Sequence, residues 1–228
     1  MMPAHKNSHA QFSEFSGEKL VQRYESAVNP VVEVSINKGK YVLNSASVNF
    51  SYGLMHEVFR SYFRQDPPGL LPDDKVLILG FGGGTIAVIL LEELGLKCSI
   101  TGVELDAAVI KAACDHFNIQ RLQKLQILQM DAMDFVNACN EKFKLIIVDI
   151  YVDNALPPQF EEESFFRRLS NCLEPGGKIV FNKFADSNAK LSEAVAIEML
   201  FKTHFDDVKT FRIPVNKKAP NIMIVGQG

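Results

Sequence analysis

Apolar residues in this chain fall into short runs that alternate with longer helical patterns. Strands are predicted at 75–79, 98–104, 125–130, 144–149 and 178–181. Helical spacing fills the intervals, at 85–94, 106–117, 133–140, 161–173 and 191–203. Strands that are nearly continuously apolar and alternate with helices are typical of a parallel sheet covered on both faces. With two more strands expected at 208–213 and 222–225, the pattern predicts an α/β fold with a doubly wound, mostly parallel, seven-stranded sheet.

The residues ahead of this alternation follow a different pattern. Residues 1–30 show little periodicity and are predicted to form a flexible tail. Two β-type runs around a glycine-containing turn predict a short β-hairpin within 31–49, and apolar residues at i, i+4 spacing predict a helix over 51–64. We therefore divide the chain into the tail at 1–30, a hairpin plus helix at 31–70 and an α/β domain at 71–228.

Composition excludes several classes of function. The formal net charge of −3 gives no overall attraction to nucleic acid or to an anionic membrane. No run approaches the about 20 apolar residues of a membrane-spanning helix, and the polar N-terminus does not resemble a secretory signal. The four cysteines are widely spaced and form no metal-binding motif. We expect a cytoplasmic protein without a metal site.

A glycine turn follows the first strand of the α/β domain. Gly80, Gly82 and Gly84 permit a tight turn and let a ligand approach the main chain, and the helix that begins at Thr85 offers free N–H groups. A dinucleotide such as NAD is disfavoured for two reasons. Thr85 stands where that pattern has Gly or Ala, and no second nucleotide-binding half follows.

An acidic residue stands at the end of each of the next three strands, at Glu104, Asp131 and Asp149. The carboxyl ends of parallel strands meet at one edge of the sheet, so these acids should converge on the crevice beside the glycine turn. Glu104 follows Gly84 by 20 positions, where a carboxylate can accept hydrogen bonds from both ribose hydroxyls. Asp131 could accept from an adenine amino group.

A set of motifs in order resembles the class I S-adenosylmethionine-dependent methyltransferases: VLILGFGGG at 76–84, VELD at 103–106, QMDAMDF at 129–135, IIVDIY at 146–151 and LEPGGKIVF at 173–181. More narrowly, the chain resembles the spermidine synthase branch of that superfamily. The hairpin followed by LMHEVF at 54–59 is similar to that branch's N-terminal segment, and the resemblance extends over residues 31–228.

The resemblance implies a Rossmann-like methyltransferase fold that binds S-adenosylmethionine or its decarboxylated form, and it assigns a role to each candidate residue. Asp149 would take the proton from an attacking amine. Tyr151 and Asp153 would contact the acceptor. The residues implied to bind the cofactor are Gly80, Phe81, Gly82, Gly84, Glu104, Leu105, Asp131, Ala132 and His56.

Departures from the spermidine synthase pattern leave the reaction open. Gly83 stands where the synthases carry an aspartate, Met55 stands where they carry a tyrosine, and Asp149 and Asp153 are spaced i, i+4 instead of i, i+3. The first hypothesis is therefore a methyltransferase-like enzyme acting on a small-molecule acceptor. The alternatives are an aminopropyltransferase and a catalytically inactive binding or dimerisation module. The oligomeric state is open, and the family resemblance and the lone hairpin favour a homodimer.

Overall fold

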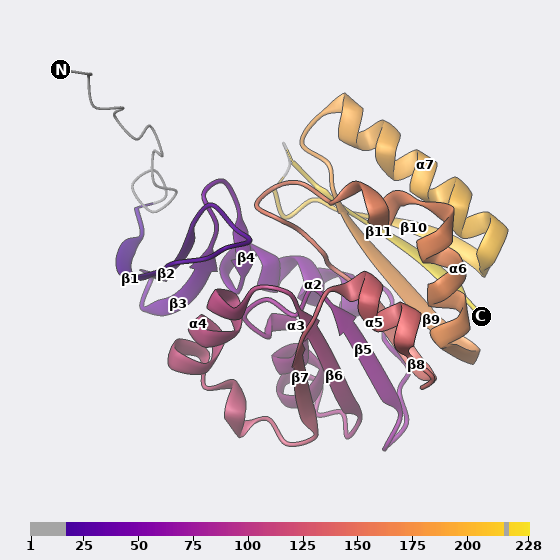
Figure 1. The fold of residues 1–228 in the computed structure, drawn as a ribbon, viewed down its shortest axis with the longest axis horizontal. Coiled ribbons are helices and arrows are strands. Elements are labelled where there is room, and N and C mark those ends of the chain that lie inside the picture. Colours follow the sequence, from indigo (N-terminus) through magenta and orange to yellow (C-terminus); the bar gives the residue numbers. More distant parts are fainter. Residues whose placement is uncertain (1–16, 217–218) are drawn as a thin grey trace.

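The chain builds a seven-stranded sheet and a separate four-stranded sheet (Figure 1). The computed structural model describes residues 17–216 and 219–228. The strand order of the larger sheet is β10-β11-β9-β8-β5-β6-β7. Its members are β5 (Lys75–Leu79), β6 (Ser99–Glu104), β7 (Leu125–Gln129), β8 (Phe143–Val148), β9 (Leu173–Phe184), β10 (Asp206–Ile213) and β11 (Asn221–Gln227).

Strands β5 to β9 pair in parallel, and β11 joins β9 and β10 in antiparallel fashion. The predicted doubly wound, mostly parallel, seven-stranded sheet is therefore confirmed. Chain order reverses direction between β5 and β8, because β6 and β7 lie on one side of β5 while β8 and β9 lie on the other. Such a reversal opens a crevice beyond the carboxyl ends of the strands, where ligands bind in folds of this type.

Helices cover both faces of the larger sheet (Figure 1). Along β5, Val76 and Ile78 pack into one core while Leu77 and Leu79 pack into the other, and all four are fully buried. The first core lies against α2 (Gly53–Gln65), α3 (Thr85–Val88), the π-helical turn η1 (Ile89–Glu93) and α4 (Ala107–Phe117). The second lies against α5 (Ala132–Ala138), α6 (Glu163–Cys172) and α7 (Asn188–His204). Within the described residues the chain also forms two short 3-10 turns, η2 (Ile119–Arg121) and η3 (Pro158–Glu161).

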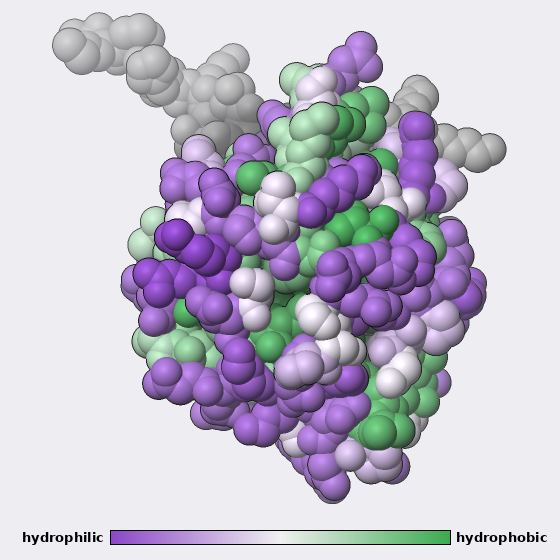
Figure 2. Space-filling model, turned by 90° about the vertical axis from the view of Figure 1, so that its right-hand side faces the viewer, coloured by the Kyte–Doolittle hydropathy of each residue, from purple (hydrophilic) through white to green (hydrophobic). Residues whose placement is uncertain are grey.

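The side of the molecule that carries α6 and α7 is mostly hydrophilic, with smaller hydrophobic areas between the polar groups (Figure 2). Helix α7 contributes exposed apolar residues, of which Met199 is 64% exposed. No helix within residues 17–216 and 219–228 is long and apolar enough to cross a membrane.

The N-terminal region is larger than the predicted hairpin. The hairpin strands β2 (Val32–Asn37) and β3 (Lys40–Asn44) are present, but β1 (Lys19–Tyr24) and β4 (Asn49–Ser51) extend them into a four-stranded antiparallel sheet. The tail prediction is thus wrong for 19–24, and residues 1–16 lie outside the described part of the chain. Strand β1 lacks a clear pattern because it is an edge strand with five consecutive exposed residues. Strand β4 has only three residues, too few to show a period.

Candidate active site

A cavity opens beyond the carboxyl ends of the central strands, and the strand register explains which residues meet there. Leu79 of β5 is level with Val103 of β6 and with Val148 of β8. The residues that follow each of these, Gly80, Glu104 and Asp149, consequently lie side by side and all line the cavity. Another part of the cavity lining comes from the N-terminal region of the chain, namely from residues 28–29, residues 47–50 and helix α2.

The glycine turn is shaped around the neighbouring strand ends. Gly80 has a φ of 83°, and a Cβ there would stand 2.2 Å from the main-chain oxygen of Asp149. The N–H groups of Gly80 and Phe81 both donate to the carbonyl of Val103, at 3.0 Å each. Gly82 has a φ of 56° and lines the cavity. Only glycine fits the close approach at position 80, where the turn meets β8.

Phe81 and Gly84, which were implied to bind the cofactor, do not line the cavity. The Phe81 ring is turned into the core, where it packs on Gly84 and fills the space beside Gly102. Gly84 is the N-cap of α3 in a left-handed conformation. Both residues pack against the protein side of the turn, and their contact with a cofactor stays a prediction.

An alanine at Gly80 is expected to lower the free energy of unfolding by at least about 2 kcal/mol, because it adds a backbone clash to an unfavourable left-handed conformation. The melting temperature should fall by about 4–8 °C. Gly95→Ala is the matched control, since Gly95 also has a positive φ (64°) but no atom lies within 4 Å of its Cβ position. Equal losses in the two variants would show that the contact with β8 contributes nothing.

Glu104 holds the glycine turn and the start of α4 together. Its Oε2 accepts from the Gly82 N–H at 2.9 Å, and its Oε1 accepts from the Asp106 N–H at 3.0 Å. Burial raises the pKa of Glu104, and the hydrogen bonds from Asp106 and Gly82 oppose that rise. The carboxylate lies at the cavity wall with Leu105 beside it, as a ribose-binding acid requires.

Asp131 begins helix α5 as its N-cap, with Oδ1 accepting from the Met133 N–H at 2.6 Å. One carboxylate oxygen is thus fixed by the helix. Asp131 lines the cavity together with Met130 and Ala132. The structure therefore brings the predicted ribose and adenine residues to the same end of the cavity.

Asp149 lines the cavity at the carboxyl end of β8, where the order of the strands reverses. Its Oδ1 accepts from the Asn182 side chain at 2.8 Å, and the side-chain Oδ1 of Asn182 in turn accepts from the Asn221 side chain at 2.9 Å. Burial raises the pKa of Asp149 from 3.8 to about 7, the amide of Asn182 opposes the rise, and the negative charge of Glu104 adds to it. A carboxylate with a pKa near neutrality is well suited to act as a general base.

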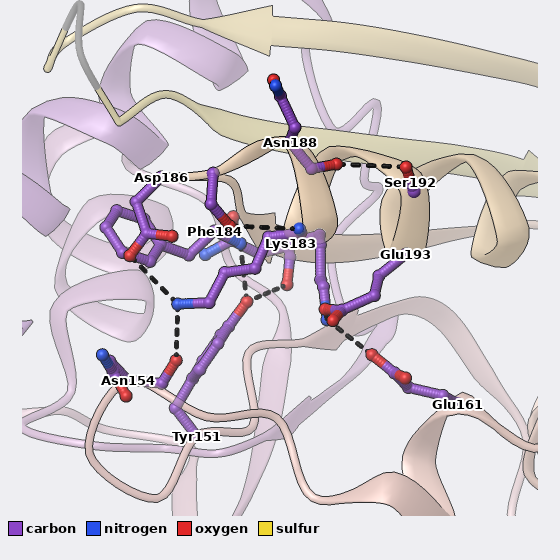
Figure 3. A network of polar contacts seen from close by, with 12 residues as sticks. Tyr151, Asn154, Glu161, Lys183, Phe184, Asp186, Asn188, Ser192 and Glu193 are labelled. Carbon is purple, nitrogen blue, oxygen red and sulfur yellow. Dashed lines mark hydrogen bonds and ion pairs between the residues drawn. The ribbon is translucent and has the colours of Figure 1, made fainter.

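Tyr151 and Asp153 line the cavity but use their polar groups on the protein. The Tyr151 hydroxyl accepts from the Phe184 N–H at 2.7 Å and donates to the Asn182 carbonyl at 3.1 Å (Figure 3). Asp153 accepts hydrogen bonds from the Ser45 hydroxyl at 2.6 Å, the Ser47 hydroxyl at 2.8 Å and the Ser47 N–H at 2.9 Å. The two residues therefore fasten the loop after β8 to β9 and to the N-terminal sheet.

His56 is not among the residues that line the cavity. Its Nε2 lies 2.6 Å from Glu93, and its ring stacks on Tyr52 at a centroid distance of 5.9 Å. The neighbouring residues Leu54, Met55 and Val58 of α2 line the cavity in its place. Helix α2 therefore faces the cavity with Leu54, Met55 and Val58, and the role of His56 in cofactor binding stays a prediction.

Comparison with known proteins decides the family. A model of the spermine/spermidine synthase domain matches residues 68–226. The chain belongs to this family. A probable polyamine aminopropyl transferase of Bifidobacterium longum is 31% identical over 125 residues, which are 54% of this chain and 27% of the relative. The polyamine aminopropyltransferase of Thermoplasma volcanium is 26% identical over 61% of this chain and 52% of the relative. The chain spans about half or less of the length of these curated relatives.

Solved structures confirm the fold of this spermidine synthase family member. A probable spermidine synthase from Corynebacterium glutamicum superposes with a TM-score of 0.75 at 20% identity, covering 91% of this chain and 80% of that one. Human methyltransferase-like protein 13, solved with SAH, superposes with a TM-score of 0.59 at 19% identity, covering 76% of this chain and 78% of that one. The solved structures that share this fold thus include both a probable spermidine synthase and a methyltransferase-like protein.

Sequence reasoning about this family member missed three asparagines of the site. Asn182 is the first polar residue after the run at 178–181, so the rule that found Asp149 could also have found it. Asn221 begins the antiparallel strand β11 and gives no such signal. Asn29 donates to Asp106 at 2.7 Å and accepts from the Asp153 N–H at 3.0 Å, which links the two ends of the cavity across distant parts of the chain.

Proposed function

We propose that this protein is an S-adenosylmethionine-dependent transferase that moves a methyl group to an amine, with Asp149 as the base. The observation that carries the proposal is the position of Asp149. It lies between the nucleoside end of the cavity, marked by Gly80 and Glu104, and the loop after β8. Its pKa of about 7 lets it exist as a carboxylate at neutral pH and still accept a proton.

The residues present fit an adenosyl cofactor. Gly80 and Gly82 line the cavity without side chains, Glu104 can accept from ribose hydroxyls, and Asp131 keeps one carboxylate oxygen outside its helix cap. When bound, the cofactor supplies a carbon that is made electrophilic by the adjacent sulfonium. Asp149 would attract the acceptor's ammonium, orient it and remove its proton, since a protonated amine has no lone pair with which to attack.

Two features favour methyl transfer over aminopropyl transfer. Ser51 occupies the space beside Gly83: its hydroxyl accepts from the Gly83 N–H at 2.7 Å, and a Cβ on Gly83 would stand 2.8 Å from the Cβ of Ser51. An acidic side chain at position 83 would therefore require Ser51 to move. Asp153, for its part, is engaged by Ser45 and Ser47. Aminopropyl transfer is the second candidate, supported by the names of the curated relatives.

Thermal shift with a series of adenosyl ligands tests this proposal. S-adenosylhomocysteine at 100 times its dissociation constant should stabilise the protein by about 2.7 kcal/mol, a rise in melting temperature of about 5–10 °C. Decarboxylated S-adenosylmethionine should give a smaller rise than S-adenosylmethionine, and the opposite order would favour aminopropyl transfer. Absence of any shift with every adenosyl ligand would overturn the proposal and support a binding module without activity.

The setting of this activity is part of the same proposal. We place it in the cytoplasm, because the described cysteines are all free thiols.

A homodimer is supported by β1, whose exposed Leu20 and Val21 lie on the open edge of the four-stranded sheet. Light scattering on the purified protein measures its molar mass, and the mass of a single chain would contradict the homodimer.

A further inference from the structure

Two buried asparagines lie one behind the other next to Asp149. Asn182 is on β9 and Asn221 begins β11, and their exposed fractions are 1% and 6%. In this antiparallel pair of strands, Asn182 is opposite Met223 and Asn221 is opposite Phe184. The two asparagines are therefore diagonal neighbours on one face of the sheet, the face that lines the cavity.

The hydrogen bonds among these three side chains all run in one direction. The Asn221 amide donates to Oδ1 of Asn182 at 2.9 Å, and the Asn182 amide donates to Oδ1 of Asp149 at 2.8 Å. An asparagine side chain has an NH₂ group on one side and an oxygen on the other, so its neighbours decide which way it faces. If the Asn182 amide were turned over, its oxygen would face the carboxylate and its NH₂ group would face that of Asn221. The donor from Asn221 therefore directs the NH₂ group of Asn182 at Asp149.

The main chain of Asn182 is held separately from its side chain. Its carbonyl accepts from the Tyr151 hydroxyl at 3.1 Å, and the same hydroxyl accepts from the Phe184 N–H at 2.7 Å. Strand β9 also pairs with β8 on one side and with β11 on the other. With the backbone fixed in this way, the direction of the amide group is the part that Asn221 controls.

Several acids surround the carboxylate that this amide contacts. Among the described residues, the titratable side chains that line the cavity with Asp149 are Glu104, Asp131, Tyr151 and Asp153. Burial raises the pKa of Asp149, the hydrogen bond from Asn182 lowers it, and the charge of Glu104 adds to the rise. Burial also raises the pKa of Tyr151, so its hydroxyl stays protonated near neutral pH. Lys183 alternates with Asn182 along β9 and so lies on the opposite face of the sheet.

We propose that Asn182 and Asn221 are positioning residues for Asp149: Asn221 orients the amide of Asn182, and Asn182 holds the carboxylate in its charged form. The proposal rests on the proposed function, because this arrangement serves catalysis only if Asp149 is the base. Asn221 has its effect through Asn182, to which it donates. The antiparallel strand β11 thus contributes to a site that is otherwise built at the ends of parallel strands.

Nuclear magnetic resonance of the full chain, labelled with carbon-13 aspartate and free of cofactor and acceptor, tests the proposal. The Asp149 carboxyl signal is identified by its loss in Asp149→Asn and is titrated with pH. Asn182→Leu and Asn221→Leu keep the branched shape of the side chain, remove its donor and leave the charge unchanged. The titration midpoint should rise by about 1–2 pH units in Asn182→Leu and by a smaller amount in Asn221→Leu. The double variant should match Asn182→Leu, because Asn221 acts through Asn182.

Ile222→Ala is the matched control. Ile222 follows Asn221 in β11 and is buried in the core on the other face of the sheet, so its truncation destabilises the same strand without touching the asparagines. It should lower the melting temperature and leave the titration midpoint of Asp149 unchanged. A second measurement needs no variant of the asparagines: in the wild-type protein the side-chain NH₂ signals of Asn182 and Asn221 should both shift with the midpoint of Asp149.

Three results would overturn the proposal. The midpoint could stay at its wild-type value in Asn221→Leu, move as far in Ile222→Ala, or move further when Asn221→Leu is added to Asn182→Leu. If Asn221→Leu does not fold, an Asn221 NH₂ signal in the wild-type protein that fails to follow Asp149 has the same consequence. Binding of S-adenosylhomocysteine is measured separately on the wild-type sample. If the midpoints move as expected but this ligand does not bind, the positioning of Asp149 stands and the transferase function fails.

Discussion

Replacing Asp149 by asparagine is expected to lower the rate of group transfer by about 10²–10⁴-fold, the range that a positioned general base contributes. Asparagine keeps the size of the side chain and can still accept the hydrogen bond from Asn182, so the cavity should keep its shape. It cannot take a proton from the acceptor amine. The measurement is kcat at saturating cofactor and acceptor, followed by mass spectrometry of the product.

Asp134→Asn is the matched control for this variant, because Asp134 is exposed and lies outside the cavity lining. It should leave kcat within about twofold of wild type, as surface substitutions generally do little to stability or structure. Binding of S-adenosylhomocysteine should be unchanged in both variants. An Asp149→Asn enzyme that retains more than a tenth of the wild-type kcat would remove Asp149 from the role of base.

The pKa of Asp149 also sets the direction of the pH dependence. Activity needs the carboxylate, so the rate should rise with pH and reach half of its maximum near pH 7. The free energy of unfolding should change in the opposite direction and fall as the pH rises. Because burial raises the pKa above its ordinary value of 3.8, folding favours the protonated form, and the stability present below pH 4 is lost as the pH rises to about 7. Asp149→Asn should therefore melt several degrees higher than wild type at pH 8 and no higher at pH 4.

The sequence predicted that the acids at the strand ends lie close together, because parallel strands in register end at the same edge of the sheet. Once β5, β6 and β8 were identified, Gly80, Glu104 and Asp149 had to lie together. The role of Asp153 could not be predicted in this way, because its partners Ser45 and Ser47 lie in the loop between β3 and β4, which only the tertiary fold brings next to it. Local pattern gives no information about such contacts.

The directions of the side chains at the glycine turn and on α2 could not be predicted from the sequence, for a common reason. A motif assigns a segment to the site, but the direction of each side chain depends on backbone torsion and helix rotation. Phe81 follows a left-handed Gly80 and is turned into the core. His56 lies next to Met55 in the chain, but adjacent residues on a helix point about 100° apart, so Met55 lines the cavity and His56 meets Glu93.

Glu104→Ala should weaken the binding of S-adenosylhomocysteine by about 10²–10⁴-fold. Two hydrogen bonds from ribose hydroxyls to a carboxylate account for this loss, at about 1.5–3 kcal/mol each. The affinity can be measured by calorimetry on purified protein. The carboxylate also accepts from the N–H groups of Gly82 and Asp106, so the variant needs a control for damage to the turn itself.

Glu104→Gln supplies that control, because its amide oxygen can still accept one hydrogen bond while the charge and the second acceptor are lost. Its NH₂ group would face one of the two N–H donors, so it should melt between Glu104→Ala and wild type and bind S-adenosylhomocysteine about tenfold more weakly than wild type. If the alanine variant is folded and binds within threefold of wild type, the ribose does not lie at Glu104. The adenosyl ligand would then have to occupy another part of the cavity, and the assignment of Asp131 to the adenine would lose its basis, because both assignments depend on the same register of β6 and β7.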